Sequence, residues 1–249
     1  MKKAILLSSV FAVGAAFAAE VESVNAIGVL KFSTTDRPAV MLVAVPFAGY
    51  GSENCNVRVT DLISTSGLPN GTILRAARET QGEYDVWHLE NGQWVPSEVV
   101  AINDAGQGKI SNAGSATDKT IGRGNSVWLD FTNLTEPDTI PGNVTLLGQM
   151  PDSGSLALAL ASGKWSLIGN PGVTASLNLV SSIKNAGVGD KICIQAANGY
   201  LTTYTYSSTD SGCWKARVGG KPTKFEAINI KDGEGCWYYA AGDGRSFTF

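Results

Sequence analysis

His88 is the only histidine in the chain. Ser-His-Asp and Cys-His mechanisms would both need it as general base, and a typical zinc site takes two or three His or Cys ligands. It stands between Trp87 and Leu89 in an alternating segment, which is typical of an ordinary strand position. The oxygen-rich turns at Asp104 and Asp243 lack the Asp/Asn ladder of an EF-hand loop. The sequence therefore predicts no triad chemistry, no metal site and no cofactor.

Paired carboxylates are the remaining catalytic chemistry. A glycoside hydrolase needs two carboxyl groups about 5 to 9.5 Å apart across a cleft. The candidates are Glu79, Glu83, Asp85, Glu90 and Glu98 in the first half and Asp190, Asp210 and Glu226 in the second. Solvated surface positions explain most such residues, so a hydrolase is the second alternative to a non-enzymatic protein.

Exposed aromatic side chains could instead bind a sugar by stacking on its ring. Tyr204 and Tyr206 are two residues apart, so on a strand they share one face, and Tyr200 shares it too. These three tyrosines are the predicted ligand platform. The tryptophans recur at matching places in the two halves and are expected to be core anchors: Trp87, Trp94, Trp128, Trp165, Trp214 and Trp237.

Two Gly-x-Gly sequences, at residues 122–124 and 233–235, precede Trp128 and Trp237. A dinucleotide loop needs a third glycine and a following helix, whereas a tryptophan-bearing strand follows here. We expect the glycines to provide positive φ or close backbone approach, and the tryptophans to pack inward.

The chain has four cysteines, Cys55, Cys193, Cys213 and Cys236. An even number in an exported chain fits disulfides, and four cysteines allow three full pairings. Three of them lie in the second half without partners at matching positions in the first. We expect one disulfide among those three, with Cys55 bridging to that half or remaining free.

Residues 1–18 have the layout of a secretory signal peptide. Lys2 and Lys3 precede a mostly apolar run that ends in a small-x-small cleavage site at residues 16–18. The run is shorter than the roughly 20 residues needed to span a bilayer, and no later segment is long enough. We expect a secreted bacterial protein, periplasmic, extracellular or at the cell surface, with no transmembrane segment.

The composition excludes some partners and favours short strands. The formal net charge is -3 and no basic cluster stands out, which argues against nucleic acid. Low charge with 29 glycines suits strands joined by tight turns. Strands are predicted at residues 40–45, 84–89, 93–95, 145–147, 156–160, 165–168, 200–206 and 246–249, with a hairpin turn at Asn91-Gly92. Short helices are predicted at residues 57–64 and 176–184.

The order of landmarks is the same in two parts of the chain, residues 19–150 and 151–249. Each has a strand that ends near a proline, a short helix, a Gly-x-Ile sequence, an aromatic hairpin and a terminal Gly-x-Gly before tryptophan. The spacings differ, but closure entropy grows slowly with loop length. We interpret the two parts as degenerate copies of one unit.

The second copy carries a motif: W-x-L-I-x-x-P at residues 165–171, G-D-x-I at 189–192 and G-x-G-x-W at 233–237. It resembles a Trp/Gly-rich β module of exported bacterial surface proteins, which also occurs at the ends of secreted enzymes, often in tandem. The first copy departs from it at Val43 and by an extra residue before Trp128. The resemblance implies a β architecture and a surface context, without a particular ligand.

The predicted fold is all-β, a pseudo-twofold barrel or sandwich of two degenerate repeats with one short helix each, packed as one domain around a shared core. The favoured function is a secreted, non-enzymatic structural, cell-surface or matrix-interaction protein. The first alternative is a carbohydrate-binding protein. Expected partners are glycans or other surface proteins, with self-assembly also open.

Overall fold

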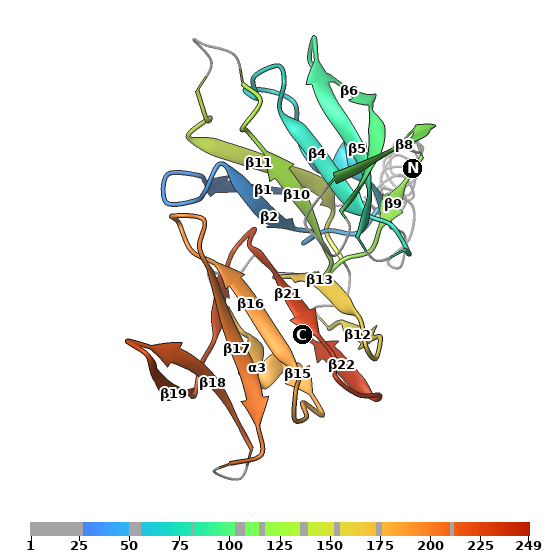
Figure 1. Ribbon diagram of the computed structural model, residues 1–249. Coiled ribbons are helices and arrows are strands. Elements are labelled where there is room, and N and C mark those ends of the chain that lie inside the picture. Colours follow the sequence, from blue (N-terminus) through green and yellow to red (C-terminus); the bar gives the residue numbers. More distant parts are fainter. Residues whose placement is uncertain are drawn as a thin grey trace, which may run out of the picture.

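A computed structural model describes residues 27–49, 56–80, 82–102, 108–114, 118–134, 139–151, 155–172, 176–209 and 212–249. These residues form mostly β-structure, with two helices of four residues each in the described part. The strands fall into two halves that stack on each other, blue to green above and yellow to red below in Figure 1. The predicted all-β class is confirmed.

The first half has eleven strands within its described residues and one helix. In chain order they are β1 (Ile27–Ser33), β2 (Val40–Ala44), β3 (Val57–Arg58), α2 (Val59–Leu62), β4 (Ile73–Ala77), β5 (Glu83–Glu90), β6 (Gln93–Pro96), β7 (Glu98–Ile102), β8 (Gly108–Gly114), β9 (Thr120–Ile121), β10 (Ser126–Asp130) and β11 (Asn143–Gln149). The main sheet has the order β2-β10-β4-β5-β7-β8, with β6 on β5, and separate pairs are β1-β11 and β3-β9.

The second half has the following elements: β12 (Ala157–Leu160), β13 (Trp165–Gly169), β14 (Ser176–Asn178), α3 (Leu179–Ser182), β15 (Ile183–Lys184), β16 (Lys191–Gln195), β17 (Leu201–Ser207), β18 (Cys213–Val218), β19 (Lys221–Phe225), β20 (Asn229–Lys231), β21 (Gly235–Tyr239) and β22 (Arg245–Thr248). Its main sheet has the order β13-β21-β16-β17-β18-β19, beside β12-β22-β15 and the pair β14-β20. Every pairing between named strands is antiparallel and stays within one half.

Local sequence signals explain many of these elements. The apolar run at residues 40–45 forms β2, which is almost wholly buried. Asn91 and Gly92 both have positive φ (50° and 76°), as a two-residue type I′ hairpin between β5 and β6 requires. The predicted helices shorten to α2 and α3, and α3 begins where the Asn178 side chain accepts a hydrogen bond from the Val180 backbone N–H.

Each half has a hydrophobic cluster of its own. In the first half, α2 and the β1-β11 pair cover the inner face of the main sheet around Leu74, Trp87 and Leu129. In the second, α3, β15 and β22 cover Ile192, Trp214 and Tyr238. Neither main sheet closes on itself, so no closed barrel is found among the described strands.

Backbone hydrogen bonds join the halves where β2 and β10 meet β13 and β21. The Ala44 N–H donates to the Gly233 carbonyl (3.0 Å), and the Gly169 N–H donates to the Gly124 carbonyl (2.8 Å). A Cβ on Gly169 would lie 2.6 Å from the Ala44 Cβ, so a larger residue does not fit there. The halves are therefore in backbone contact at this junction.

The expected disulfide in the second half does not form, because Cys193, Cys213 and Cys236 are free thiols. Cys193 on β16 lies opposite Trp237 of β21 and shares its face. Cys236 precedes Trp237 in the chain, so it points to the other face of the sheet. Cys213 lies on β18, and β17 lies between β18 and the strand of Cys193, β16. The two strands are therefore about 10 Å apart, which is beyond disulfide reach. The predicted signal peptide and Cys55 lie outside the described residues.

Candidate functional site

A cleft of about 420 Å³ lies at the junction of the two halves. Its floor is the outer face of the second half's main sheet, the face turned away from that half's hydrophobic cluster. One wall consists of residues 77–80 and 82–84 of the first half, including Arg78, Glu79 and Glu83. The cleft is therefore built from residues far apart in the chain.

The strand register explains why the floor side chains face outward. Cys236 and Tyr238 point into the core, so Trp237 between them must point out. Leu167 on β13 and Cys193 on β16 lie opposite Trp237 and share its face. With Leu201 on β17, the floor crosses four neighbouring strands, about 14 Å.

Aromatic rings dominate one end of the cleft. Trp165 is 37% exposed, and its ring lies 5.3 Å from that of Tyr239 on the next strand. The half-buried ring of Trp237 lies 4.9 Å from Trp128 of the first half in an edge-to-face contact. Trp128 and Trp237 thus pack against each other between the halves and not inward, which corrects our prediction for both. Trp165 is not a core anchor either.

Charged groups surround this apolar floor. Arg78 donates two hydrogen bonds to the buried Asp85 carboxylate, at 3.0 and 2.7 Å, and this ion pair fixes the start of the wall. Lys164 is exposed beside Trp165, while Glu79 is exposed and Glu83 half-buried on the wall. The site combines flat apolar surface with hydrogen-bonding groups, as small-molecule sites commonly do.

The predicted tyrosine platform does not form an exposed row. Tyr200 is 76% exposed in the turn before β17. Tyr204 packs edge-to-face on Phe225 (4.9 Å) and Tyr206 on Trp214 (5.3 Å), both at the edge of the second hydrophobic cluster. Burial raises the pKa of Tyr204 above its ordinary value. Tyr204 and Tyr206 lie on the inner face of β17, because the opposite face of this strand belongs to the floor of the cleft.

The candidate carboxylates separate into two groups. Glu79 and Glu83 line the cleft. Asp85 is buried in its ion pair with Arg78, and Glu226 pairs with Lys224 at 2.8 Å. Glu90 is exposed at the end of β5, 3.6 Å from the His88 ring. The Glu98 side chain, Asp104 and Asp210 lie outside the described residues.

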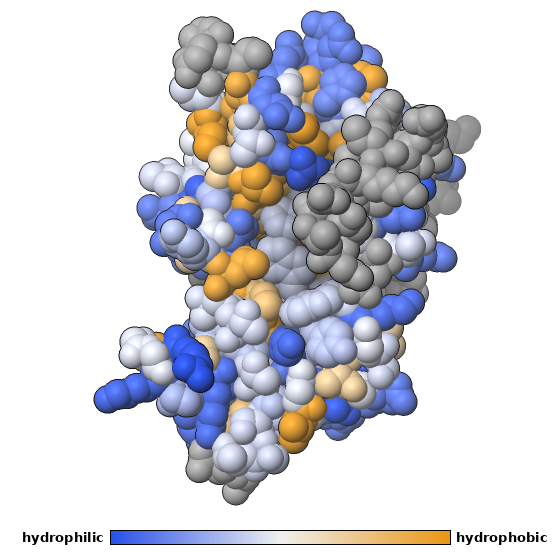
Figure 2. Space-filling view, viewed as in Figure 1, coloured by the Kyte–Doolittle hydropathy of each residue, from blue (hydrophilic) through white to orange (hydrophobic). Residues whose placement is uncertain are grey.

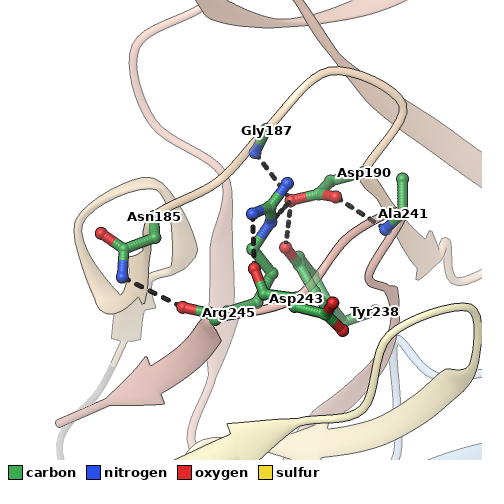
Figure 3. A network of polar contacts seen from close by, with 8 residues as sticks. Asn185, Gly187, Asp190, Tyr238, Ala241, Asp243 and Arg245 are labelled. Carbon is green, nitrogen blue, oxygen red and sulfur yellow. Dashed lines mark hydrogen bonds and ion pairs between the residues drawn. The ribbon is translucent and has the colours of Figure 1, made fainter.

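Asp190 is the centre of a buried polar network (Figure 3). Its carboxylate accepts hydrogen bonds from the Tyr238 hydroxyl (2.6 Å), Arg245 Nε (3.0 Å) and the backbone N–H groups of Gly187 (2.8 Å) and Ala241 (2.8 Å). Burial, reinforced by the hydrogen bond to Asp190, raises the pKa of Tyr238 well above its ordinary value. With every oxygen satisfied, Asp190 holds the loops around β16 and β22 and is not available to a substrate.

Among the described residues, no group of three or more His, Cys, Asp and Glu side chains could hold a metal ion. In the same part of the chain, no helix has the length and hydropathy needed to cross a membrane. Sequence reasoning missed the roles of Trp165 and Trp237. In β21, which carries Trp237, both faces are apolar, so alternation does not tell which face meets the core. No known protein family, curated protein or solved structure matches this chain.

Proposed function

We propose that the protein is an exported, non-enzymatic carbohydrate-binding protein whose saccharide lies in the cleft between the two halves. The observation that carries this proposal is the exposed Trp165 ring beside Trp237 in a cleft of about 420 Å³. A structural, cell-surface or matrix-interaction role, the function favoured from the sequence, is compatible with it, because binding a surface glycan is one way to fill that role.

The physical argument rests on the two faces of a sugar ring. The C–H groups of a pyranose form an apolar patch that packs on an aromatic ring, and its hydroxyl groups need hydrogen-bond partners. Trp165 and Trp237 offer the apolar surface, and Lys164, Glu79 and Glu83 offer donors and acceptors around it. The cleft floor crosses four strands, which suits an oligosaccharide better than a single sugar.

A glycan panel with purified protein tests the proposal. We expect specific binding of at least one saccharide, weakened about tenfold or more by Trp165→Ala through loss of the stacking surface. Tyr200→Ala is the matched control, since that exposed aromatic side chain is not part of the cleft lining. Absence of binding across the panel, or equal binding by wild type and Trp165→Ala, would show the proposal to be wrong.

Glu79 and Glu83 favour a second candidate function, because two carboxylates line the same cleft as the tryptophans. A carboxylate-pair glycoside hydrolase would use one as acid and the other as base or nucleophile. Long incubation with each saccharide that binds, followed by measurement of new reducing ends, separates the candidates. Our proposal predicts that no new reducing ends form. Release that disappears in Glu79→Gln or Glu83→Gln would establish the hydrolase.

The repeat is also a proposal, and the strand pairings support it. The pairs β1-β11, β2-β10, β3-β9 and β4-β5 have counterparts in β12-β22, β13-β21, β14-β20 and β16-β17, in the same chain order. The helix follows β3 in one half and β14 in the other. We propose that residues 19–150 and residues 151–249 are degenerate copies of one unit.

The contacts at the junction are reciprocal. Val43 forms a bridge with Glu234, and Ile168 forms one with Asn125. Val43 and Ile168 each lie three residues before a proline, and Asn125 and Glu234 each lie three before the tryptophan of their own half. Reciprocal contacts of this kind are typical of an isologous interface, which supports a pseudo-twofold relation between the halves.

A further inference from the structure

The outer face of the second half continues beyond the cleft into another depression. Its volume is about 530 Å³, and it shares Leu201 with the cleft. Its lining includes Thr203 and Thr205 of β17 and Lys215 and Arg217 of β18. Because the two depressions meet at Leu201, a ligand longer than the cleft would enter this one next.

The strand register places these side chains on the same face as the tryptophans. Tyr239 lies opposite Lys191, Lys191 opposite Thr205, and Thr205 opposite Lys215. Residues opposite each other on neighbouring strands share a face. One row therefore leads from the aromatic end of the cleft across β21, β16, β17 and β18.

Basic side chains lie on this part of the outer face. The whole chain has a formal net charge of -3, yet Lys191 of β16 and Lys215 and Arg217 of β18 lie on one face of one sheet. Figure 2 shows hydrophilic residues over the projecting β18-β19 hairpin, at the lower left. Lys224 extends the row, but Glu226 lies 2.8 Å from it and offsets its charge.

The donors at this second depression suit an acidic group. Arg217 has five N–H donors, and a guanidinium binds a carboxylate or sulfate through two parallel hydrogen bonds. Its Nη1 donates to the Gly220 carbonyl at 3.4 Å, which tethers the side chain to the hairpin turn. Thr203 and Thr205 add hydroxyl groups, which donate to or accept from the hydroxyls of a sugar.

We propose that the ligand is an anionic oligosaccharide, with one ring on the tryptophans of the cleft and an acidic group on Lys215 and Arg217. This inference rests on the proposed function. The shared chemistry is a carboxylate or sulfate on a pyranose chain, as in oligomers of uronic acids or in sulfated oligosaccharides.

The test compares a uronic-acid oligosaccharide with its methyl ester, which keeps the rings and removes the charge, and with a sulfated oligosaccharide. We expect an acidic form to bind at least about tenfold more tightly than the ester. The advantage should shrink at high salt and in the double variant Lys215→Gln/Arg217→Gln. Lys221→Gln is the control, since it removes a charge from the same hairpin on the opposite face.

Binding of the acidic and esterified forms with equal affinity, both lost in Trp165→Ala, would overturn this inference and leave the proposed function intact. Absence of saccharide binding would overturn both. Equal binding of single-stranded DNA or polyglutamate, weakened as much by Lys221→Gln as by the double variant, would mean unspecific attraction of polyanions and would also overturn it. Preference for the carboxylated or the sulfated form identifies the acidic group.

Discussion

At the residue scale, the Asp190 network stabilises the second half. The Tyr238 hydroxyl donates to Asp190 inside the fold, where neither group is exposed. Tyr238→Phe removes a hydrogen bond to a carboxylate and should lower the free energy of unfolding by about 1.5 to 3 kcal/mol. Urea unfolding measures this. Tyr239→Phe, on the neighbouring outward-facing ring, should change it by less than about 0.5 kcal/mol. If Tyr238→Phe and Tyr239→Phe lower the free energy of unfolding equally, the hydrogen bond to Asp190 does not stabilise the fold.

Cys236 makes stability depend on pH in the alkaline range. Burial raises the pKa of its thiol far above the ordinary value, and Cys193 and Glu234 add to the increase. The unfolded thiol ionises near pH 8.5, whereas the folded thiol stays protonated. The contribution of Cys236 is therefore complete below about pH 8.5 and declines above it, by up to about 1.4 kcal/mol per pH unit.

The corresponding experiment is urea unfolding of the reduced protein at several values between about pH 7.5 and 9.5. Cys236→Ala should lower stability at neutral pH through the loss of packing, and it should also flatten the alkaline decline. If the variant and the wild type lose stability in parallel over this range, the thiol is not the group responsible.

At the scale of the elements, the junction depends on glycine in β13. A Cβ on Gly169 would lie 2.6 Å from the Ala44 Cβ and 2.8 Å from the Asn125 carbonyl oxygen. Gly169→Ala should therefore destabilise the protein by about 1 to 3 kcal/mol, a typical effect of overpacking. At Gly142 an added Cβ meets nothing within 4 Å, so thermal unfolding of Gly142→Ala is the control. A neutral Gly169→Ala would mean that the halves are not packed as described.

Strands were predictable where one face is polar or where turn residues mark an end. The apolar run of β2 and the Asn91-Gly92 turn gave correct elements. The orientation of β21 was not predictable, because Cys236 and Tyr238 are as apolar as Trp237 and Tyr239. When both faces of a strand are apolar, alternation does not tell which one meets the core. The sequence therefore did not indicate that Trp237 faces away from the core.

At the scale of the whole molecule, the cleft exists only because two units meet. Trp165 and Trp237 belong to the second half, and the wall with Arg78 and Glu79 belongs to the first. Each half has its own hydrophobic cluster, so the outer sheet faces are left to contact each other and to line the cleft. No local pattern in either half predicts a site of this kind, because its parts come together only in the assembled pair.

The most direct test of the saccharide site is a titration followed by the indole N–H signals of the six tryptophans. The account predicts that the signals of Trp165 and Trp237 shift with saccharide, while those of Trp87 and Trp214, buried in the two clusters, stay in place. Trp165→Phe assigns the key signal. Saccharide binding that leaves Trp165 and Trp237 unshifted would contradict the account and move the site elsewhere on the molecule.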